Sequence, residues 1–538
     1  MKHKIKIEHR YLVFPIDETK NCVSISVIIG DRIVEQVFCN LHPDCGSGYK
    51  TMVDMSEFIG QEVLIMPENC KSEWAKNPLG REYTEEELDA LVACIENADD
   101  YTDKPHYSEK YRPKFHYTTQ RGWMNDPNGC IYYDGLYHLY YQHCPGATYA
   151  MWDNNHWGHA VSRDLIKWEE YEPILRFPHE ASGTGFIDRR DGLPCVTTGN
   201  KIFKSRDSCF HFEYMSPNTD GSTYPGDPKI LYHEESGRYI NVSLKDLTTY
   251  SIASSPDLET WQQESEITNF RECPDMVRYR IEGTDTYKWI LNGGDGAYMI
   301  GEFDGHEFKP DPIPEDRVDQ YLATFKACSD FTNKYNGAYV DQNEPDDWER
   351  FTVYAFQNFD NAPDGRKVRI AWYTVNYSWY GEGFNQAMTI PQELKLAETG
   401  FGVRLCALPV RELEAYRTEC VSGEGENVSL SLEGGQAFDV EARISFDSKI
   451  SLHGFDIRYS ADEKKLYIAP PGKKEFSAPF VPMGDTVVFR AVFDTMTAEF
   501  YFGKGEVYVP VKPENRDLTG IELDISGNGK ATVYRLER

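Results

Sequence analysis

The chain has 538 residues, too many for one compact domain, so two to four domains are expected. It carries 56 Lys and Arg against 87 Asp and Glu, which gives a net charge of −31 at pH 7. This charge repels nucleic-acid phosphates and anionic lipid, and we therefore expect neither nucleic acid nor a membrane as a partner. Aromatic residues make up 14% of the chain, a share that favours strands over helices.

The 13 cysteines are scattered, with no Cys-x-x-Cys pair. This spacing predicts free thiols in a reducing compartment and neither a disulfide framework nor a zinc site. Residues 1–21 contain no stretch typical of a signal peptide, and their longest apolar run, Tyr11–Ile16, is too short to span a bilayer. We therefore expect a cytoplasmic protein, and we expect no metal and no cofactor.

The first hundred residues predict a small β-sandwich-like domain, residues 1–100. Short runs rich in Val, Ile and aromatic residues predict strands at Tyr11–Ile16, Val23–Ile29, Ile33–Cys39 and Glu62–Met66. One helix is expected over Glu85–Asn97, because Thr84 and Glu87 form a capping box ahead of an apolar face. The polar run Asp99–Glu109 predicts a linker.

Residues 108–408 repeat a pattern of strand, tight turn and strand. Ile131–Tyr141 predicts a hairpin with Asp134 and Gly135 at its tip. Similar hairpins are expected at Ile230–Ile240, Met276–Gly293 and Tyr298–Phe308. Repeated hairpins without helices over such a length predict an all-β fold, and a β-propeller accommodates them best.

The last part of the chain, residues 420–538, predicts a C-terminal β-sandwich. Val428–Leu432, Ala437–Ser445 and Thr486–Phe502 alternate apolar and polar residues, as half-buried strands do. A short helix at about residues 409–417 should connect this sandwich to the propeller.

Asp126 is the first candidate for chemistry, in the stretch Trp-Met-Asn-Asp-Pro-Asn-Gly. Pro127 restricts Asp126 to extended geometry, so its carboxylate should be held on stiff backbone, as a preorganised nucleophile requires. Taken alone, however, the stretch is more typical of an Asx turn.

Two further carboxylates stand in comparable positions. Glu272, in Arg-Glu-Cys-Pro-Asp, suits a general acid but equally a salt-bridged loop, and Asp227 before Pro228 carries the same ambiguity. All three acids come just before predicted strands, and the inner strands of a propeller line one central funnel. Glycoside cleavage needs two carboxyls about 5–5.5 Å apart for retention or roughly 6.5–9.5 Å for inversion, which inner strands can provide.

Six motifs in this order resemble glycoside hydrolase family 32, the invertases, levanases, inulinases and fructan exohydrolases. They are Trp123–Gly129, Tyr141–Gln142, His156–Ser162, Asp227–Pro228, Glu272–Asp275 and Phe384–Leu394. The resemblance covers about residues 108–538 and implies a five-bladed β-propeller followed by a β-sandwich. It implies a retaining exo-β-fructofuranosidase that releases fructose from short β-fructans or sucrose, with a fructoside as its small-molecule partner.

The resemblance also implies residue roles. Asp126 would be the nucleophile, Glu272 the acid and base, and Asp227 the group that binds sugar hydroxyls and stabilises the transition state. The implied substrate-binding residues are Asn125, Gln142, Trp152, Ser182 and Arg271. Gly226 departs from the family, which usually has an arginine there; altered specificity, an arginine from elsewhere and weakened activity are all open.

Two alternatives accompany this interpretation. A fructosyltransferase would use the same fructosyl-enzyme intermediate and pass the sugar to another acceptor. A non-catalytic fructan-binding protein would keep the fold, and its support is Gly226. The sequence leaves open whether the N-terminal domain binds sugar or forms a homo-oligomer contact, and whether β-2,1 or β-2,6 links are preferred.

Overall fold

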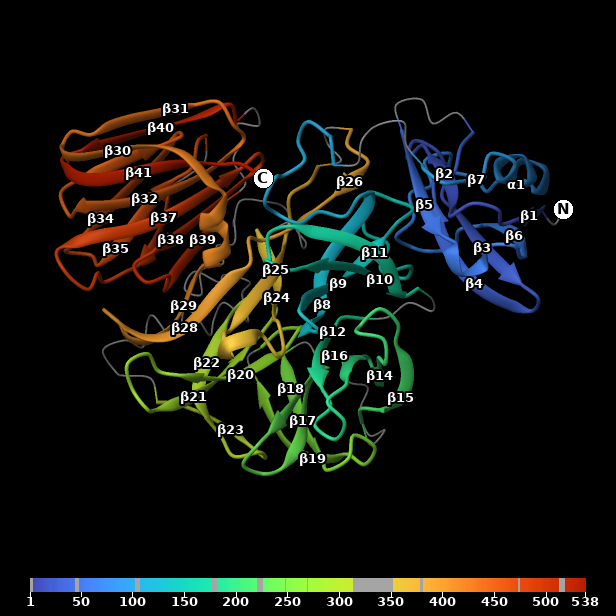
Figure 1. The fold of residues 1–538 in the computed structure, drawn as a ribbon, viewed down its shortest axis with the longest axis horizontal. Coiled ribbons are helices and arrows are strands. Elements are labelled where there is room, and N and C mark those ends of the chain that lie inside the picture. The colour runs from blue at the N-terminus through green and yellow to red at the C-terminus, as the bar shows by residue number, and fades with distance from the viewer. Residues whose placement is uncertain are drawn as a thin grey trace.

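The structure is a computed structural model, and it is built almost entirely of strands (Figure 1). It describes residues 3–43, 48–101, 107–176, 181–219, 226–246, 248–268, 270–312, 352–377, 381–472, 475–511 and 518–538. Part of the expected linker lies outside these residues. No helix in the described ranges is long and apolar enough to cross a membrane.

Residues 3–98, which we call the N-terminal domain, form two sheets with one helix beside them. The first sheet has the order β1 (His3–Lys6), β6 (Glu62–Asn69), β3 (Val23–Ile29) and β4 (Arg32–Cys39). The second has the order β5 (Tyr49–Asp54), β2 (Tyr11–Ile16) and β7 (Glu96–Ala98). Apolar side chains of both sheets and of helix α1 (Glu85–Val92) share one core.

Helix α1 begins where the capping box predicted and ends earlier than expected. The Thr84 side chain accepts from the backbone N–H of Glu87, and the Glu87 side chain accepts from that of Thr84. The predicted continuation to Asn97 was wrong, because residues 96–98 form strand β7 instead. The Asn97 side-chain amide donates to the carbonyl oxygens of His9 and Tyr11, which fixes it to the edge of β2.

Five sheets form the propeller, each numbered here as a blade in chain order. Blade 1 contains β8 (Gly122–Tyr133), β9 (Leu136–Cys144), β10 (His156–Ser162) and β11 (Trp168–Leu175). Blade 2 contains β12 (Gly183–Ile187), β13 (Pro194–Thr198), β14 (Lys201–Lys204) and β15 (Glu213–Pro217). Blade 3 contains β16 (Gly226–His233), β17 (Arg238–Asp246), β18 (Thr249–Ser255) and β19 (Gln262–Thr268).

Blades 4 and 5 complete the ring. Blade 4 contains β20 (Asp275–Arg280), β21 (Tyr287–Asn292), β22 (Tyr298–Phe303) and β23 (Phe308–Pro310). Blade 5 contains β24 (Val353–Asn358), β25 (Val368–Tyr373), β28 (Gln392–Thr399) and β29 (Gly402–Pro409), with β27 (Ala387–Met388) beside β25. The first strands of the blades contact one another in a closed ring, β8–β12–β16–β20–β24–β8. Strand β26 (Phe384–Asn385) comes from the blade 5 region and pairs in parallel with β8, which joins the two ends of the propeller.

The propeller hairpins match the sequence prediction closely. Asp134 and Gly135 have φ of 49° and 81°, as a tight hairpin turn between β8 and β9 requires. The predicted five-bladed fold is confirmed, and each blade places its first strand on the inside of the ring.

The C-terminal sandwich packs two six-stranded sheets against each other. One has the order β30 (Arg417–Glu426), β41 (Asn528–Leu536), β32 (Ala437–Ser445), β37 (Thr486–Asp494), β38 (Thr497–Phe502) and β39 (Val507–Val511). The other has the order β31 (Ser429–Glu433), β40 (Gly520–Ser526), β33 (Lys449–Leu452), β34 (Phe455–Ser460), β35 (Lys465–Ala469) and β36 (Phe476–Pro479). The expected connecting helix is a 3-10 helix at Arg411–Tyr416.

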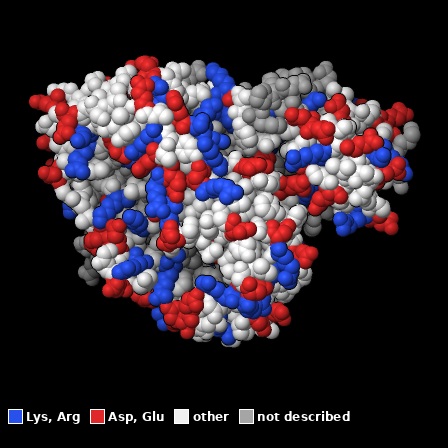
Figure 2. Space-filling view, viewed as in Figure 1, with Lys and Arg blue, Asp and Glu red and all other residues white. Residues whose placement is uncertain are grey.

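A buried polar network joins the sandwich to the start of the propeller. Both ring nitrogens of His116 bind carboxylates of the sandwich, at 2.8 Å from Asp494 Oδ2 and 2.8 Å from Glu499 Oε1. The two carboxylates raise the pKa of His116 to about 9 despite its burial. Figure 2 shows basic side chains interspersed with acidic ones over the visible face, so the negative net charge is not confined to one region of that face.

Candidate active site

Each of the five blades contributes a polar side chain at the beginning of its inner strand. These residues are Asp126 in β8, Ser182 just before β12, Asp227 in β16, Glu272 just before β20 and Tyr354 in β24. Because the inner strands form one ring and share a direction, their beginnings meet at the same end of the propeller. The three predicted acids are thus gathered at one place by the fold.

Local backbone irregularities set the direction of two of these acids. The pairing of β8 with β9 shifts register between Met124 and Pro127, and that of β16 with β17 shifts between Gly226 and Lys229. Asp126 and Asp227 lie within these bulges, where an extra residue turns a side chain out of the regular alternation. Asp126 and Asp227 lie inside their strands, so the prediction that they come just before the strands was wrong for both. Asp227 has a φ of 45°, so its proline does not hold it in extended geometry.

Hydrogen bonds hold the Asp126 carboxylate from both sides. The Ser182 hydroxyl donates to Oδ2 at 2.7 Å, and the Asn125 amide donates to Oδ1 at 3.1 Å. Gln142 connects these donors, since its amide donates to Ser182 at 2.8 Å while its oxygen accepts from Asn125 at 2.5 Å. Burial raises the pKa of Asp126, and the bonds from Ser182 and Asn125 oppose that rise. The predicted residues Asn125, Gln142 and Ser182 thus surround the proposed nucleophile.

Asp227 shares a neighbour with Asp126. The backbone N–H of Cys273 donates to Asp227 Oδ2 at 3.1 Å, and the Cys273 thiol lies 3.7 Å from the same oxygen. Burial, then the charges of Glu272 and Asp126, raise the pKa of Asp227 to about 7. Three carboxyl groups therefore influence one another electrostatically at this end of the propeller.

Glu272 is exposed to solvent and held by blades 3, 4 and 5. The Tyr354 hydroxyl donates to Glu272 Oε2 at 2.8 Å. The Glu272 carbonyl oxygen accepts from Gly294 N at 2.8 Å and from the Tyr250 hydroxyl at 2.9 Å. Glu272 and Cys273 have φ of 22° and 47°, conformations that proteins keep mainly at functional sites. An exposed, braced carboxyl suits a group that exchanges protons with substrate and water.

Trp152 and Arg271 are the two remaining residues that were predicted to bind substrate. Trp152 is half-buried in the loop between β9 and β10 and meets Trp123 edge to face, with ring centroids 6.5 Å apart. Trp123 Nε1 in turn donates to Asn125 Oδ1 at 3.0 Å. The half-buried Arg271 comes directly before Glu272, and its carbonyl oxygen accepts from the Tyr250 hydroxyl at 2.7 Å.

A buried ion pair that the sequence did not indicate supports the site. Lys229 Nζ lies 3.0 Å from Asp275 Oδ1, and Asp275 Oδ2 accepts from Asn358 N at 2.7 Å. This contact connects β16, β20 and β24, so Asp275 of the Glu-Cys-Pro-Asp motif holds blades together. Lys229 could have been suspected, because a lysine two residues after Asp227 in an inner strand needs a buried partner.

At Gly226 the strand lies close to its neighbour. A Cβ at this position would be 3.1 Å from the Leu244 Cβ, so a larger residue requires Leu244 to shift by a few tenths of an ångström. The departure from the family's arginine is thus accompanied by close packing of β16 against β17.

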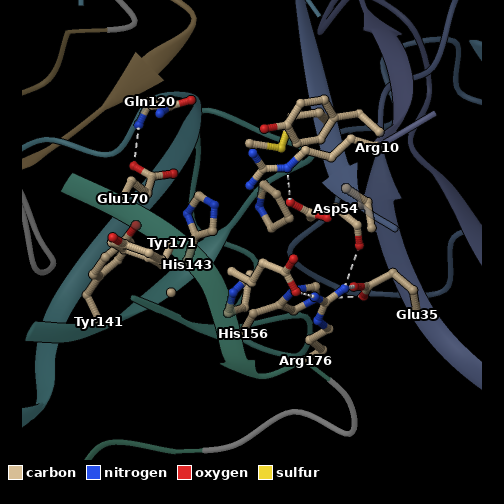
Figure 3. Close-up of a pocket in the computed structure, with 17 residues that line it drawn as sticks. Arg10, Glu35, Asp54, Gln120, Tyr141, His143, His156, Glu170, Tyr171 and Arg176 are labelled. Atoms are coloured by element: carbon tan, nitrogen blue, oxygen red, sulfur yellow. Dashed lines mark hydrogen bonds and ion pairs between the residues drawn. The ribbon is translucent and has the colours of Figure 1, made fainter. Parts of the chain in front are cut away.

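A polar cavity lies between the N-terminal domain and blade 1 (Figure 3). Arg10 Nε donates to Asp54 Oδ2 at 2.6 Å, and Arg176 Nη1 donates to the Asp54 carbonyl oxygen at 2.8 Å. The buried Glu35 lies at this interface, and burial raises its pKa to about 7. Arg176, which follows β11, also lies 3.7 Å from Glu35 Oε2, so it links blade 1 to the N-terminal domain and makes this cavity a contact between domains.

Cleavage of a glycosidic bond requires a pair of carboxyl groups beside it, and the acids at this end of the ring include such candidates. The model of the glycosyl hydrolases family 32 N-terminal domain matches residues 116–407. The levanase of Bacillus subtilis (strain 168) is 27% identical over 525 residues, which is 83% of this chain and 72% of the levanase. The invertase of Schizosaccharomyces pombe is 31% identical over 269 residues, 40% of this chain and 46% of the invertase.

Solved structures share the fold. The exo-inulinase of Aspergillus awamori superposes with a TM-score of 0.65 at 20% identity, over 80% of this chain and 99% of the inulinase. The fructofuranosidase of Schwanniomyces occidentalis bound to fructose gives 0.65 at 20% identity, over 81% and 100%. The protein is a glycoside hydrolase. It belongs to glycosyl hydrolases family 32.

Proposed function

We propose that the protein is a retaining exo-β-fructofuranosidase that releases terminal fructose from short β-fructans or sucrose. The observation that carries this proposal is the environment of Asp126, a carboxylate held by donors from Asn125 and Ser182 beside two further acids. The similar levanase, exo-inulinase and invertase support fructosides as the substrate class.

In the first step Asp126 attacks the anomeric carbon of the terminal fructose. The carboxyl of Glu272 gives its proton to the glycosidic oxygen, so that the bond breaks and the leaving sugar departs as an alcohol. A fructosyl ester of Asp126 forms, and Glu272 is left ionised. Asp227 accepts hydrogen bonds from sugar hydroxyls and stabilises the positive charge that develops on the ring.

In the second step Glu272 takes a proton from water, and the hydroxyl attacks the same carbon. The ester breaks, Asp126 is released as carboxylate, and fructose leaves with its original anomeric configuration. Tyr354 keeps Glu272 in one orientation through both steps, because its hydroxyl bonds Oε2.

The test is incubation with sucrose, 1-kestose, inulin and levan, with products separated by chromatography and the first anomer followed by NMR. Free fructose as the main product, released first as the β anomer, supports the proposal. Larger fructosylated products in excess of free fructose would establish a transferase. No fructose and no transfer from any of the four substrates would contradict the proposal.

A further inference from the structure

The N-terminal domain holds the loop that carries Trp152. This loop, residues 145–155, connects β9 to β10. Several hydrogen bonds join it to the N-terminal domain. Among them are Thr148 Oγ1 to Glu18 Oε1 at 2.6 Å, Lys76 N to Tyr149 Oη at 3.1 Å, Ser72 Oγ to Asp153 Oδ1 at 2.7 Å, and Phe38 N to Asn154 Oδ1 at 2.9 Å. The chain also approaches closely at Gly146, where a Cβ would lie 2.3 Å from the Phe38 carbonyl oxygen. The conformation of the loop therefore depends on the N-terminal domain.

A row of tryptophan rings runs from the nucleophile to the N-terminal domain. Trp123 bonds Asn125, which in turn bonds Asp126. Trp152 stands edge to face with Trp123 at 6.5 Å, and Trp74 stands edge to face with Trp152 at 6.4 Å. Trp123 is buried, Trp152 is half-buried and Trp74 is 46% exposed. The row thus becomes more accessible with distance from Asp126.

Trp74 has the surroundings of a ligand-binding residue. Its ring is among the largest apolar groups that the chain exposes, and it lies against a residue already expected to bind sugar. The Ser72 hydroxyl accepts from Trp74 N at 3.1 Å and donates to the exposed carboxylate of Asp153, the residue after Trp152. This carboxylate can accept further hydrogen bonds. Exposed aromatic faces with a few polar groups form the walls of small-molecule sites. The family model begins at residue 116, so Trp74 lies outside the range that it matches.

We propose that Trp74 is a specificity-determining residue that binds the leaving-group sugars of an oligosaccharide, together with Trp152. This inference rests on the proposed function. The terminal fructose reacts at Asp126, and two ring-to-ring steps separate Trp123 from Trp74, so Trp74 meets the sugars beyond the scissile bond. The N-terminal domain then contributes to the selection of longer substrates.

The kinetic test compares Trp74→Ala and Trp74→Phe with wild type on sucrose, 1-kestose and nystose. Leu79→Ala is the matched control, because Leu79 is a similarly exposed apolar side chain of the same segment. For Trp74→Ala we expect kcat/KM on nystose to fall about tenfold because KM rises while kcat is unchanged. Loss of one aromatic contact predicts a change of this size. Inhibition by free fructose should stay unchanged, and Trp74→Phe should restore most of the loss. Equal effects of Trp74→Ala and Leu79→Ala would overturn the proposal.

A binding measurement separates this inference from the proposed function. Calorimetry in the Asp126→Asn background should show that Trp74→Ala raises the Kd for nystose about tenfold and leaves that for fructose unchanged. Wild-type protein that releases no fructose would refute the proposed function, while this binding difference would still support the role of Trp74. Unchanged nystose affinity, or no binding of nystose at all, would overturn that role.

Discussion

The Cys273 thiol lies 3.5 Å from Oδ2 of Asp126, although 147 positions separate the two residues. It also lies 3.7 Å from Asp227 Oδ2, so one sulfur touches two of the three acids. Burial, and after it the negative charges of the three acids, raise the pKa of this thiol well above its ordinary value. Cys273 therefore remains a neutral thiol and serves as a weak donor to the carboxylates.

Replacement of Cys273 should change the pH dependence of the reaction. Cys273→Ala removes a donor that favours ionised Asp126, so the pKa of Asp126 should rise. The acid limb of the kcat/KM profile should then move to higher pH, and Cys273→Ser should restore it. The exposed Cys420→Ala is the control. An acid limb that stays in place in Cys273→Ala would show that the thiol does not act on Asp126.

Asp227 should titrate near neutral pH and respond to its neighbours. Its pKa of about 7 comes from burial first, then from the charges of Glu272 and Asp126. Removal of a neighbouring negative charge favours the ionised form, so Glu272→Gln should lower the pKa of Asp227, and Asp126→Asn should lower it less. Carboxyl-selective infrared or carbon NMR spectroscopy measures both shifts. A pKa of Asp227 that neither variant changes would contradict the electrostatic coupling.

The link between propeller and sandwich should depend on His116. His116→Ala leaves the buried carboxylates of Asp494 and Glu499 without their cation, and we expect a loss of about 3–5 kcal/mol in the free energy of unfolding. The folded pKa of about 9 lies above the ordinary value of 6.5. The stabilisation by His116 is therefore complete below pH 6.5 and is lost as the pH rises through 9.

Denaturant unfolding at several pH values measures this contribution. The exposed pair of His9 with Asp99 provides the control, and His9→Ala should have a much smaller effect. A His116→Ala variant as stable as wild type would rule out His116 as the residue that joins the two parts.

Glu35 should make the interface between the N-terminal domain and blade 1 sensitive to pH. Its folded pKa of about 7 lies above the ordinary 4.5, because burial disfavours its charged form. Its contribution to stability is complete below pH 4.5 and is lost as the pH rises through 7. Glu35→Gln should remove this part of the fall in the free energy of unfolding with rising pH. Substitution of the exposed Glu57, Glu57→Gln, should leave that fall unchanged. If the free energy of unfolding changes with pH in the same way for wild type and Glu35→Gln between pH 5 and 8, Glu35 is not the source of the pH sensitivity.

Local sequence signals predicted the elements that depend on neighbouring residues. The turn at Asp134 and Gly135, the capping box at Thr84 and the repeated hairpins each involve residues a few positions apart. The end of α1 was misplaced because Asn97 binds β2, whose residues lie more than 80 positions earlier.

The residues around Asp126 were predictable through the family resemblance. Asn125, Gln142 and Ser182 were expected near Asp126, and the structure brings them together through hydrogen bonds. The bulge at Asp227 depends on the register with β17. The approach of Trp74 to Trp152 depends on how the N-terminal domain packs on blade 1, which no local pattern encodes.

The proposed mechanism depends above all on Asp126, and one substitution tests its role directly. Fructose release from sucrose and 1-kestose is measured for wild type, Asp126→Asn and, as a control on the same hairpin, Asp134→Asn. With a nucleophile at Asp126 we expect kcat to fall by about 10⁴-fold or more in Asp126→Asn, with unfolding temperature and nystose binding retained. Asp134→Asn should match wild type. An Asp126→Asn protein that releases fructose at the wild-type rate would show that Asp126 is not the nucleophile.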